Sequence, residues 1–268
     1  MAWCMKWFSV EKVPYANNQG VRIHYEVEGN GKPVVLVHGL MGYLEQWHEL
    51  GYVDSLKKDF TVILVDLRGH GDSDKPHESE AYKRELLATD IIAVMDVLNI
   101  RETDFLGYSL GGRMAFILAK YAPERFRSFI IGGANPDPRP RTRIRWLLQL
   151  FKKGMGTYVE LFEKERGIKM TPQAKTKILS NDTEALTAFV SANEWRANLE
   201  DALPNMTMPC LFFIGEADPS YAGAKKCANL LPNAEFVSFP GLRHVDVNLQ
   251  SRLVLPHTMK FLEKVGHK

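Results

Sequence analysis

Cysteine is scarce in this chain of 268 residues, and its three copies form no motif. Cys4, Cys210 and Cys227 are an odd number and widely spaced, so they give neither a disulfide framework nor the ligand spacing of a zinc site. Cys210 lies in an apolar run, where we expect a buried thiol. No other residue cluster has metal-ligand spacing, so we expect no metal and no cofactor.

Long apolar runs are also missing. No stretch approaches the roughly 20 apolar residues that a membrane-spanning helix needs, and residues 1–9 are too short and too broken for a signal peptide. Neither sign of charge is in excess, since 34 basic and 32 acidic residues give a formal net charge of +2. We therefore expect a cytoplasmic protein that binds neither nucleic acid nor a membrane.

What is present is typical of a globular chain, with 45% apolar and 25% charged residues. The length fits one large α/β domain with an inserted subdomain, present as a monomer or homodimer. Short continuous apolar runs, typical of strands buried on both faces, recur along the chain. They occupy residues 34–37, 62–65, 105–106, 129–131 and 211–214.

Helical spacing separates these runs, as in Leu87, Ile91 and Met95, and again over residues 110–121. Strands that alternate with helices predict a doubly wound, mostly parallel sheet. Residues 21–28 alternate apolar and polar side chains instead, which predicts a half-buried antiparallel strand at the N-terminal side.

The alternation stops between residues 135 and 209. Prolines open and close this segment, and apolar residues at helical spacing lie between them. We predict a core of residues 1–134 and 210–268, and an inserted helical cap of residues 135–209. Such insertions usually shape a substrate pocket.

The sequence Gly107-Tyr108-Ser109-Leu110-Gly111 follows an apolar strand and precedes a helix. This is the pattern of a nucleophile elbow, in which a strained turn exposes the serine and glycines avoid collisions with neighbouring segments. The alternative is an ordinary glycine-rich turn with a capping serine. The strand before it, the helix after it and the partners described next favour the nucleophile.

A serine hydroxyl needs a base, and the base needs an orienting acid. Of eight histidines, His244 alone follows a late apolar strand on a loop at the sheet edge predicted for Ser109. Asp218, directly after the strand at 211–214, is the predicted acid. Glu216 is a near competitor for that role and Asp137 a more distant one.

Negative charge on a tetrahedral intermediate needs fixed donors. We predict that the backbone N–H groups of Leu110 and Leu40 supply them, because Leu110 follows the nucleophile and Leu40 follows an apolar strand that runs into His38-Gly39. His38 is then structural, and makes hydrogen bonds within the loop rather than moving protons.

These features resemble the α/β-hydrolase superfamily, which has the same elbow and the same chain order of Ser109, Asp218 and His244. Residues 66–73 (Asp-Leu-Arg-Gly-His-Gly-Asp-Ser) also resemble an architectural segment of that family. The resemblance covers the chain from about residue 21. It implies the α/β-hydrolase fold, a mostly parallel doubly wound sheet with an antiparallel N-terminal portion and an inserted helical cap.

Within the superfamily the chain is most similar to small capped carboxylesterases, enol-lactonases and cofactor-free haloperoxidase-type enzymes. Haloalkane dehalogenases and epoxide hydrolases use an aspartate nucleophile, whereas this chain has Ser109. Relatives that cleave carbon–carbon bonds tend to have a more glycine-rich oxyanion segment than residues 38–42. The resemblance implies a carboxylic ester hydrolase that cleaves an ester or lactone of a small, mainly apolar substrate through an acyl-enzyme.

Three alternatives remain on the same triad: a hydrolase-fold ligand receptor with little turnover, a perhydrolase or haloperoxidase-like enzyme, and a carbon–carbon hydrolase. The substrate pocket is predicted from residues near the elbow and aromatic residues of the cap, namely Met41, Tyr108, Trp146, Phe162 and Trp195. The alternating run Arg139, Arg141, Arg143 and Arg145 favours a solvated cap edge over a site for an anionic substrate.

Overall fold

The computed structural model describes residues 15–192 and 197–266. Within them one mixed sheet has the strand order β1-β2-β4-β3-β5-β6-β7-β8. The strands are β1 (Tyr15–Asn18), β2 (Val21–Glu28), β3 (Lys32–Val37), β4 (Phe60–Val65), β5 (Thr103–Tyr108), β6 (Phe126–Gly132), β7 (Cys210–Gly215) and β8 (Ala234–Phe239). Strands β3 to β8 are parallel, whereas β1 and β2 are antiparallel, as the alternating pattern of residues 21–28 predicts.

The apolar runs form strands because both faces of the sheet are covered. In β3, Val35 and Val37 belong to one buried cluster and Val34 and Leu36 to the other, and all four are 0% exposed. A strand in this position needs apolar side chains at every residue, which explains a continuous run rather than an alternating one.

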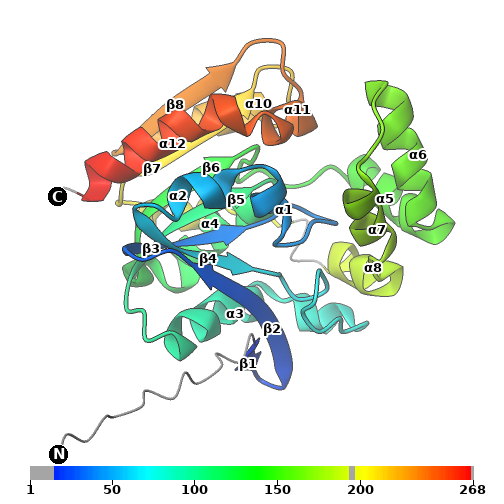
Figure 1. Ribbon diagram of the computed structural model, residues 1–268, viewed down its shortest axis with the longest axis horizontal. Coiled ribbons are helices and arrows are strands. Elements are labelled where there is room, and N and C mark those ends of the chain that lie inside the picture. Colours follow the sequence, from blue (N-terminus) through cyan, green and yellow to red (C-terminus); the bar gives the residue numbers. More distant parts are fainter. Residues whose placement is uncertain (1–14, 193–196, 267–268) are drawn as a thin grey trace, which may run out of the picture.

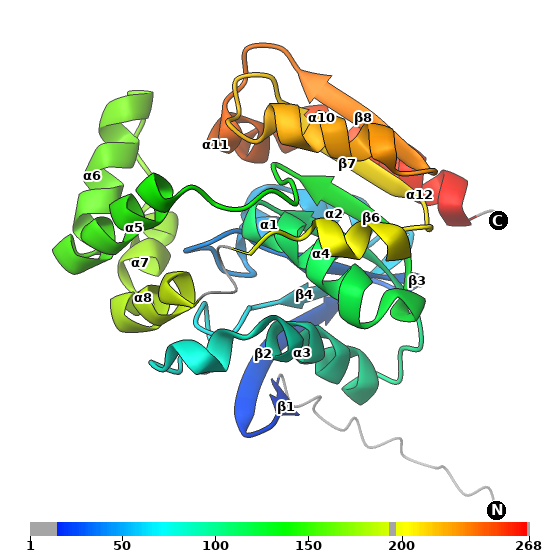
Figure 2. The same cartoon turned by 180° about the vertical axis from the view of Figure 1, so that it is seen from behind.

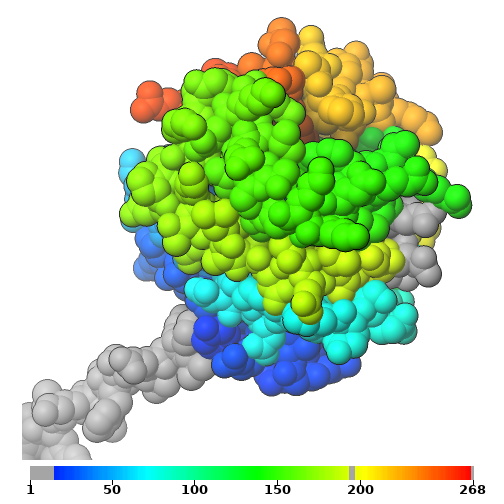
Figure 3. Space-filling model, turned by 90° about the vertical axis from the view of Figure 1, so that its right-hand side faces the viewer, coloured from blue at the N-terminus to red at the C-terminus, as the bar shows by residue number. Residues whose placement is uncertain are grey.

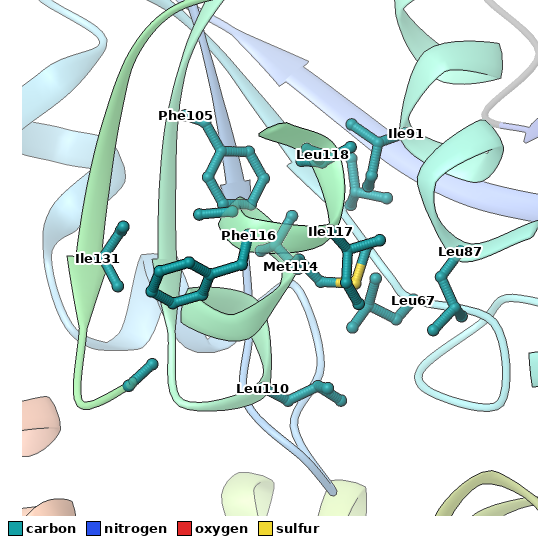
Figure 4. Packing of buried hydrophobic residues seen from close by; sticks show 14 of the residues in the cluster. Leu67, Leu87, Ile91, Phe105, Leu110, Met114, Phe116, Ile117, Leu118 and Ile131 are labelled. Atoms are coloured by element: carbon teal, nitrogen blue, oxygen red, sulfur yellow. The ribbon is translucent and has the colours of Figure 1, made fainter. Parts of the chain in front are cut away.

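Helices cover the two faces in separate groups (Figures 1 and 2). One face carries α3 (Arg84–Val97), α4 (Leu110–Tyr121) and α10 (Tyr221–Leu230). The other carries α1 (Gln46–Glu49), α2 (Tyr52–Leu56), α11 (His244–Leu249) and α12 (Ser251–Gly266). Figure 4 shows the packing of α4 on the sheet, where Met114 and Phe116 lie among Phe105, Ile131 and Ile91.

Between β6 and β7 the chain forms α5 (Arg141–Lys153), α6 (Met155–Arg166), α7 (Pro172–Leu179) and α8 (Thr183–Ser191). These four helices, the described helices of the predicted cap, lie together on one side of the molecule (Figure 3). Short 3-10 turns lie at η1 (Ser79–Tyr82), η2 (Pro123–Arg125) and η3 (Glu200–Asn205).

Polar contacts fix α7 and α8 to the loops that follow β3 and β4. Lys177 pairs with Glu45, and the Asn181 side chain donates to the Met41 carbonyl over 3.1 Å. His77 pairs with Asp182, which also caps α8.

Strand β1 and helix α7 form in segments that the sequence pattern left without an element. Both are short, at four and eight residues, and carry too few apolar residues for a clear period. Cys210 and Cys227 are both buried as free thiols, which confirms the expectation for Cys210. Over the described ranges, none of the helices is long and apolar enough to cross a bilayer.

Candidate active site

Ser109 lies in the tight turn between β5 and α4, and its backbone is strained there. Its φ of 58° is positive, which is unfavourable for a residue with a side chain. Gly107 and Gly111 keep ordinary φ values, and their role is to leave space. A Cβ at Gly107 would lie 2.1 Å from the Gly111 carbonyl oxygen, and one at Gly111 would lie 2.0 Å from the Val37 carbonyl oxygen.

The structure brings the three predicted catalytic residues into one hydrogen-bonded line. The Ser109 hydroxyl lies 2.8 Å from His244 Nε2, and His244 Nδ1 lies 2.5 Å from an Asp218 carboxylate oxygen. In this arrangement Nδ1–H donates to Asp218, which leaves Nε2 as the acceptor for the serine proton. The Asp218 side chain is 1% exposed and that of His244 is 32% exposed, so the acid is shielded while the base remains accessible.

The loops after β7 and β8 are fixed to each other, and this brings the acid to the base. The Ala217 N–H donates to the Leu242 carbonyl over 3.0 Å, and a Cβ at Gly215 would lie only 2.0 Å from that oxygen. The second oxygen of Asp218 accepts the Ser220 N–H over 2.8 Å. Both carboxylate oxygens therefore have partners, and the acid has one orientation.

The two competing acids lie elsewhere. Glu216 is exposed and accepts a hydrogen bond from the Ser238 hydroxyl over 2.9 Å. Asp137 accepts from the Asn135 side chain over 2.9 Å. Of the three candidates, only Asp218 contacts His244.

The loop after β3 approaches Ser109 closely, as the predicted oxyanion site requires. A Cβ at Gly39 would lie 3.4 Å from the Ser109 Cβ. Within the part of the chain that the structure describes, neither the Leu40 N–H nor the Leu110 N–H donates to a protein acceptor. Both groups are therefore available for a ligand oxygen, and the role of the two donors stays a prediction.

His38 is held inside the loop network. It is 2% exposed, its Nδ1 lies 2.7 Å from the Gly39 carbonyl oxygen, and its Nε2 accepts the Leu67 N–H over 3.2 Å. Burial lowers its pKa, which keeps the ring neutral. The geometry fits a structural histidine.

The segment 66–73 is organised around the buried Asp66. Its oxygens accept the backbone N–H groups of Leu44 and Asp72 and lie 2.9 Å from His24 Nδ1. Burial opposes ionisation, but the hydrogen bonds outweigh it and lower the pKa of Asp66. His24, Asp66 and Asp72 are close enough to hold a metal ion, yet the Asp66 oxygens already have donors, so hydrogen bonds account for this cluster.

Residues predicted for the pocket occupy different surroundings. Met41 is buried at a positive φ of 64°, and Phe162 lies against Tyr158 and Arg166 of its own helix. Trp146 is 38% exposed. Trp195 lies outside the described residues. Tyr108 differs from the prediction, because it is buried on the opposite face of the sheet from α4, where its ring packs against Phe213.

The four arginines of the run have different surroundings. Arg141 and Arg145 are exposed, as expected for a solvated edge. Arg139 is half-buried 3.4 Å from the Ser220 hydroxyl, where burial lowers its pKa to about 10. Arg143 lies 4.4 Å above the Trp146 ring.

The sequence analysis missed Arg113, which is 2% exposed within α4. Its guanidinium donates to the carbonyls of Asn135, Asp137 and Ala197, at 2.9, 2.8 and 3.0 Å. These carbonyls lie where the chain leaves β6 for the cap and where it returns. A charged residue inside the otherwise apolar stretch 110–119 was the available signal.

A family model described as alpha/beta hydrolase fold matches residues 32–169, which is more than half of the chain. The solved enol-lactonase from Burkholderia xenovorans LB400 superposes with a TM-score of 0.82 at 22% identity, covering 93% of this chain and all of that one. At this identity the likeness concerns the fold.

Two curated relatives are similar in sequence. Epoxide hydrolase 4 of Mus musculus is 31% identical over 147 residues, which cover 54% of this chain but only 40% of that protein. A putative non-heme chloroperoxidase of Synechocystis is 25% identical over 271 residues, covering 92% of this chain and 97% of that protein.

Proposed function

Because the chain belongs to the α/β-hydrolase fold family, we propose that it is a serine hydrolase that cleaves a carboxylic ester or lactone through an acyl-enzyme. The observation that supports this proposal is the line of hydrogen bonds from Ser109 through His244 to Asp218. An activated serine is suited to acyl transfer because it can attack a carbonyl carbon and later be released by water.

In the first half of the reaction, His244 Nε2 accepts the Ser109 proton as Oγ attacks the substrate carbonyl. The Leu40 and Leu110 N–H groups bind the oxyanion, and each such donor contributes about 3 kcal/mol to transition-state stabilisation. The imidazolium then gives its proton to the leaving alcohol, and the acyl group stays on Ser109. In the second half, His244 takes a proton from water, which attacks the acyl carbonyl and regenerates the serine.

The substrate is proposed to be small and mainly apolar. The residues proposed for the acyl pocket are Met41, whose backbone carbonyl accepts a hydrogen bond from the Asn181 side chain, and the cap aromatics Trp146 of α5 and Phe162 of α6. An apolar acyl pocket distinguishes chain lengths by about 1 to 3 kcal/mol per methylene group. Substitution of Trp146 or Phe162 by alanine should then shift preference toward longer acyl chains and leave the pH profile unchanged.

Turnover of p-nitrophenyl esters of graded acyl length tests the proposal. The wild-type protein should give many turnovers, whereas Ser109→Ala should lose nearly all activity and keep its fold, since only one oxygen is removed. A single slow turnover would instead support a ligand receptor, and a preference for lactones over linear esters would narrow the substrate to lactones. Near-normal hydrolysis by Ser109→Ala would overturn the proposal.

A second candidate is perhydrolysis, which the near full-length similarity to a putative non-heme chloroperoxidase favours. Hydrogen peroxide in place of water would attack the acyl-enzyme and release a peracid and free Ser109. Peracid formation from an ester and hydrogen peroxide, lost in Ser109→Ala, would support it. The similarity to epoxide hydrolase 4 covers less than half of that protein, and position 109 holds serine rather than the aspartate associated with epoxide opening.

A further inference from the structure

The tyrosine that precedes the proposed nucleophile contacts the proposed base from behind. Tyr108 is the last residue of β5 and is 4% exposed. Its ring centroid lies 5.4 Å from that of His244, and its hydroxyl donates a hydrogen bond to the His244 backbone carbonyl. Tyr108 is buried in the cluster on the sheet face opposite α4, so its side chain contacts His244 from within the core.

Two glycines at the end of β6 leave the space for this contact. A Cβ at Gly132 would lie 2.6 Å from Cδ2 of the Tyr108 ring. A Cβ at Gly133 would lie 2.9 Å from the Tyr108 hydroxyl and 3.1 Å from His244 Cε1. Side chains at these positions would therefore displace the tyrosine, the histidine or both.

The position of the His244 imidazole depends on how firmly its backbone is held. His244 is the first residue of α11, a helix of six residues, and among the described residues its imidazole makes hydrogen bonds only with Ser109 and Asp218. Burial raises the pKa of Tyr108 well above its ordinary value, so the hydroxyl keeps its proton and remains a donor.

We propose that Tyr108 is a positioning residue for His244, which fixes the first turn of α11 so that Nε2 stays within hydrogen-bond distance of Ser109. The inference rests on the proposed function, because it assigns Tyr108 a role in the same reaction. A general base must lie about 2.6 to 3.2 Å from the proton that it takes. Small displacements of catalytic groups are costly, since a misplacement of about 1 Å can lower the rate about a hundredfold.

Tyr108→Phe removes only the hydroxyl and tests the proposal. Because His244 acts in both acylation and deacylation, kcat should fall about tenfold with KM nearly unchanged, and fluorophosphonate labelling should slow by the same factor. Tyr82→Phe is a matched control, because Tyr82 is 1% exposed and also donates to a backbone carbonyl, that of Pro76, over 2.6 Å. The control should lose comparable stability and retain kcat.

Equal rates in wild type and Tyr108→Phe, or equal losses in the two tyrosine variants, would overturn the positioning role. A second readout needs no turnover: the downfield proton resonance of the His244–Asp218 hydrogen bond should shift or broaden in Tyr108→Phe and stay in place in Tyr82→Phe. If the resonance changes in this way but Ser109→Ala still hydrolyses esters, the proposed function is wrong. The conclusion that Tyr108 positions His244 would still hold. An unchanged resonance in Tyr108→Phe overturns the inference alone.

Discussion

Three acidic residues compete for His244 in the sequence, and their surroundings separate them. Asp218 is shielded from solvent and has donors on both oxygens, so its charge is fixed beside the imidazole. Glu216 is exposed and accepts a hydrogen bond from Ser238 of β8, and Asp137 accepts one from the Asn135 side chain. An orienting acid has to hold one tautomer of the histidine, and an exposed carboxylate with other partners does not do this.

Asp218→Asn should therefore lower kcat about 10³- to 10⁴-fold, because the amide no longer stabilises the tautomer that accepts the serine proton. Glu216→Gln and Asp137→Asn are the matched controls and should keep kcat close to that of the wild type. Steady-state hydrolysis of a p-nitrophenyl ester by the three variants provides the comparison. A larger loss in either control than in Asp218→Asn would show that another acid orients His244.

His70 should make the fold sensitive to acid. It is 0% exposed between His38 and Phe189, and burial lowers its pKa to about 3 from an ordinary 6.5. The unfolded chain therefore binds this proton first as pH falls, and stability decreases from about pH 6.5 toward pH 3. At about 1.4 kcal/mol per pKa unit, the loss amounts to roughly 5 kcal/mol.

His70→Asn keeps a donor for the Arg68 carbonyl, which lies 3.2 Å from Nδ1, and removes the titration. Denaturant unfolding between pH 7 and pH 4 should show a weaker pH dependence in this variant, even though lost packing makes it less stable at pH 7. Parallel pH profiles for variant and wild type would mean that His70 contributes nothing to acid sensitivity.

Sequence reasoning expected Ser109, His244 and Asp218 to lie together because each follows an apolar strand, and parallel strands bring their carboxyl ends to one edge. The structure brings the three side chains together, and their catalytic roles stay a prediction. Sequence reasoning misplaced Tyr108 because adjacency to the nucleophile says nothing about which face of the sheet a side chain occupies. Alternation along β5 sends neighbouring residues to opposite faces, and this was the usable signal. The three carbonyls bound by Arg113 come from distant segments, so no local pattern identifies them.

Helix α4 joins the nucleophile to the cap. Its N-terminal end follows Ser109, and Arg113 in its first turns binds the chain on both sides of the cap insertion. Burial lowers the pKa of Arg113 to about 9, so the guanidinium stays charged at neutral pH. A buried carbonyl that loses its charged hydrogen-bond donor lowers the stability of the folded protein.

Arg113→Met should lower the free energy of unfolding by about 3 kcal/mol, because the buried carbonyls of Asn135, Asp137 and Ala197 lose their donor. Lys264→Met serves as the control, since Lys264 makes an exposed ion pair with Glu235 and its loss should change stability little. Urea unfolding measures both. Equal stability of the two variants would show that Arg113 does not tie the cap segments to α4.

Prediction at the level of elements succeeded where apolar periodicity is strong. The helix expected over residues 110–121 has the observed bounds of α4, and the runs at 34–37 and 62–65 lie within β3 and β4. The order of β4 and β3 in the sheet could not be predicted, because strand order depends on contacts between distant segments. The short elements β1 and α7 are stabilised by tertiary packing rather than by their own pattern.

Across the whole molecule, the sheet positions the three residues of the site. The ends of β5, β7 and β8 carry Ser109, Asp218 and His244, and α5 to α8 lie at the same edge (Figure 1). The family model matches residues 32–169, which include Ser109, and a shared fold does not by itself determine the substrate. The nucleophile is therefore the part of the account that can be tested without knowing the substrate.

The most direct test is to treat the native protein with a serine-directed fluorophosphonate and to locate the label by peptide mass spectrometry. The account predicts one label per chain, on Ser109, with no labelling in Ser109→Ala or in denatured protein and strongly reduced labelling in His244→Ala. A label on another residue, or native protein that reacts no faster than denatured protein, would contradict the assignment of Ser109 as an activated nucleophile.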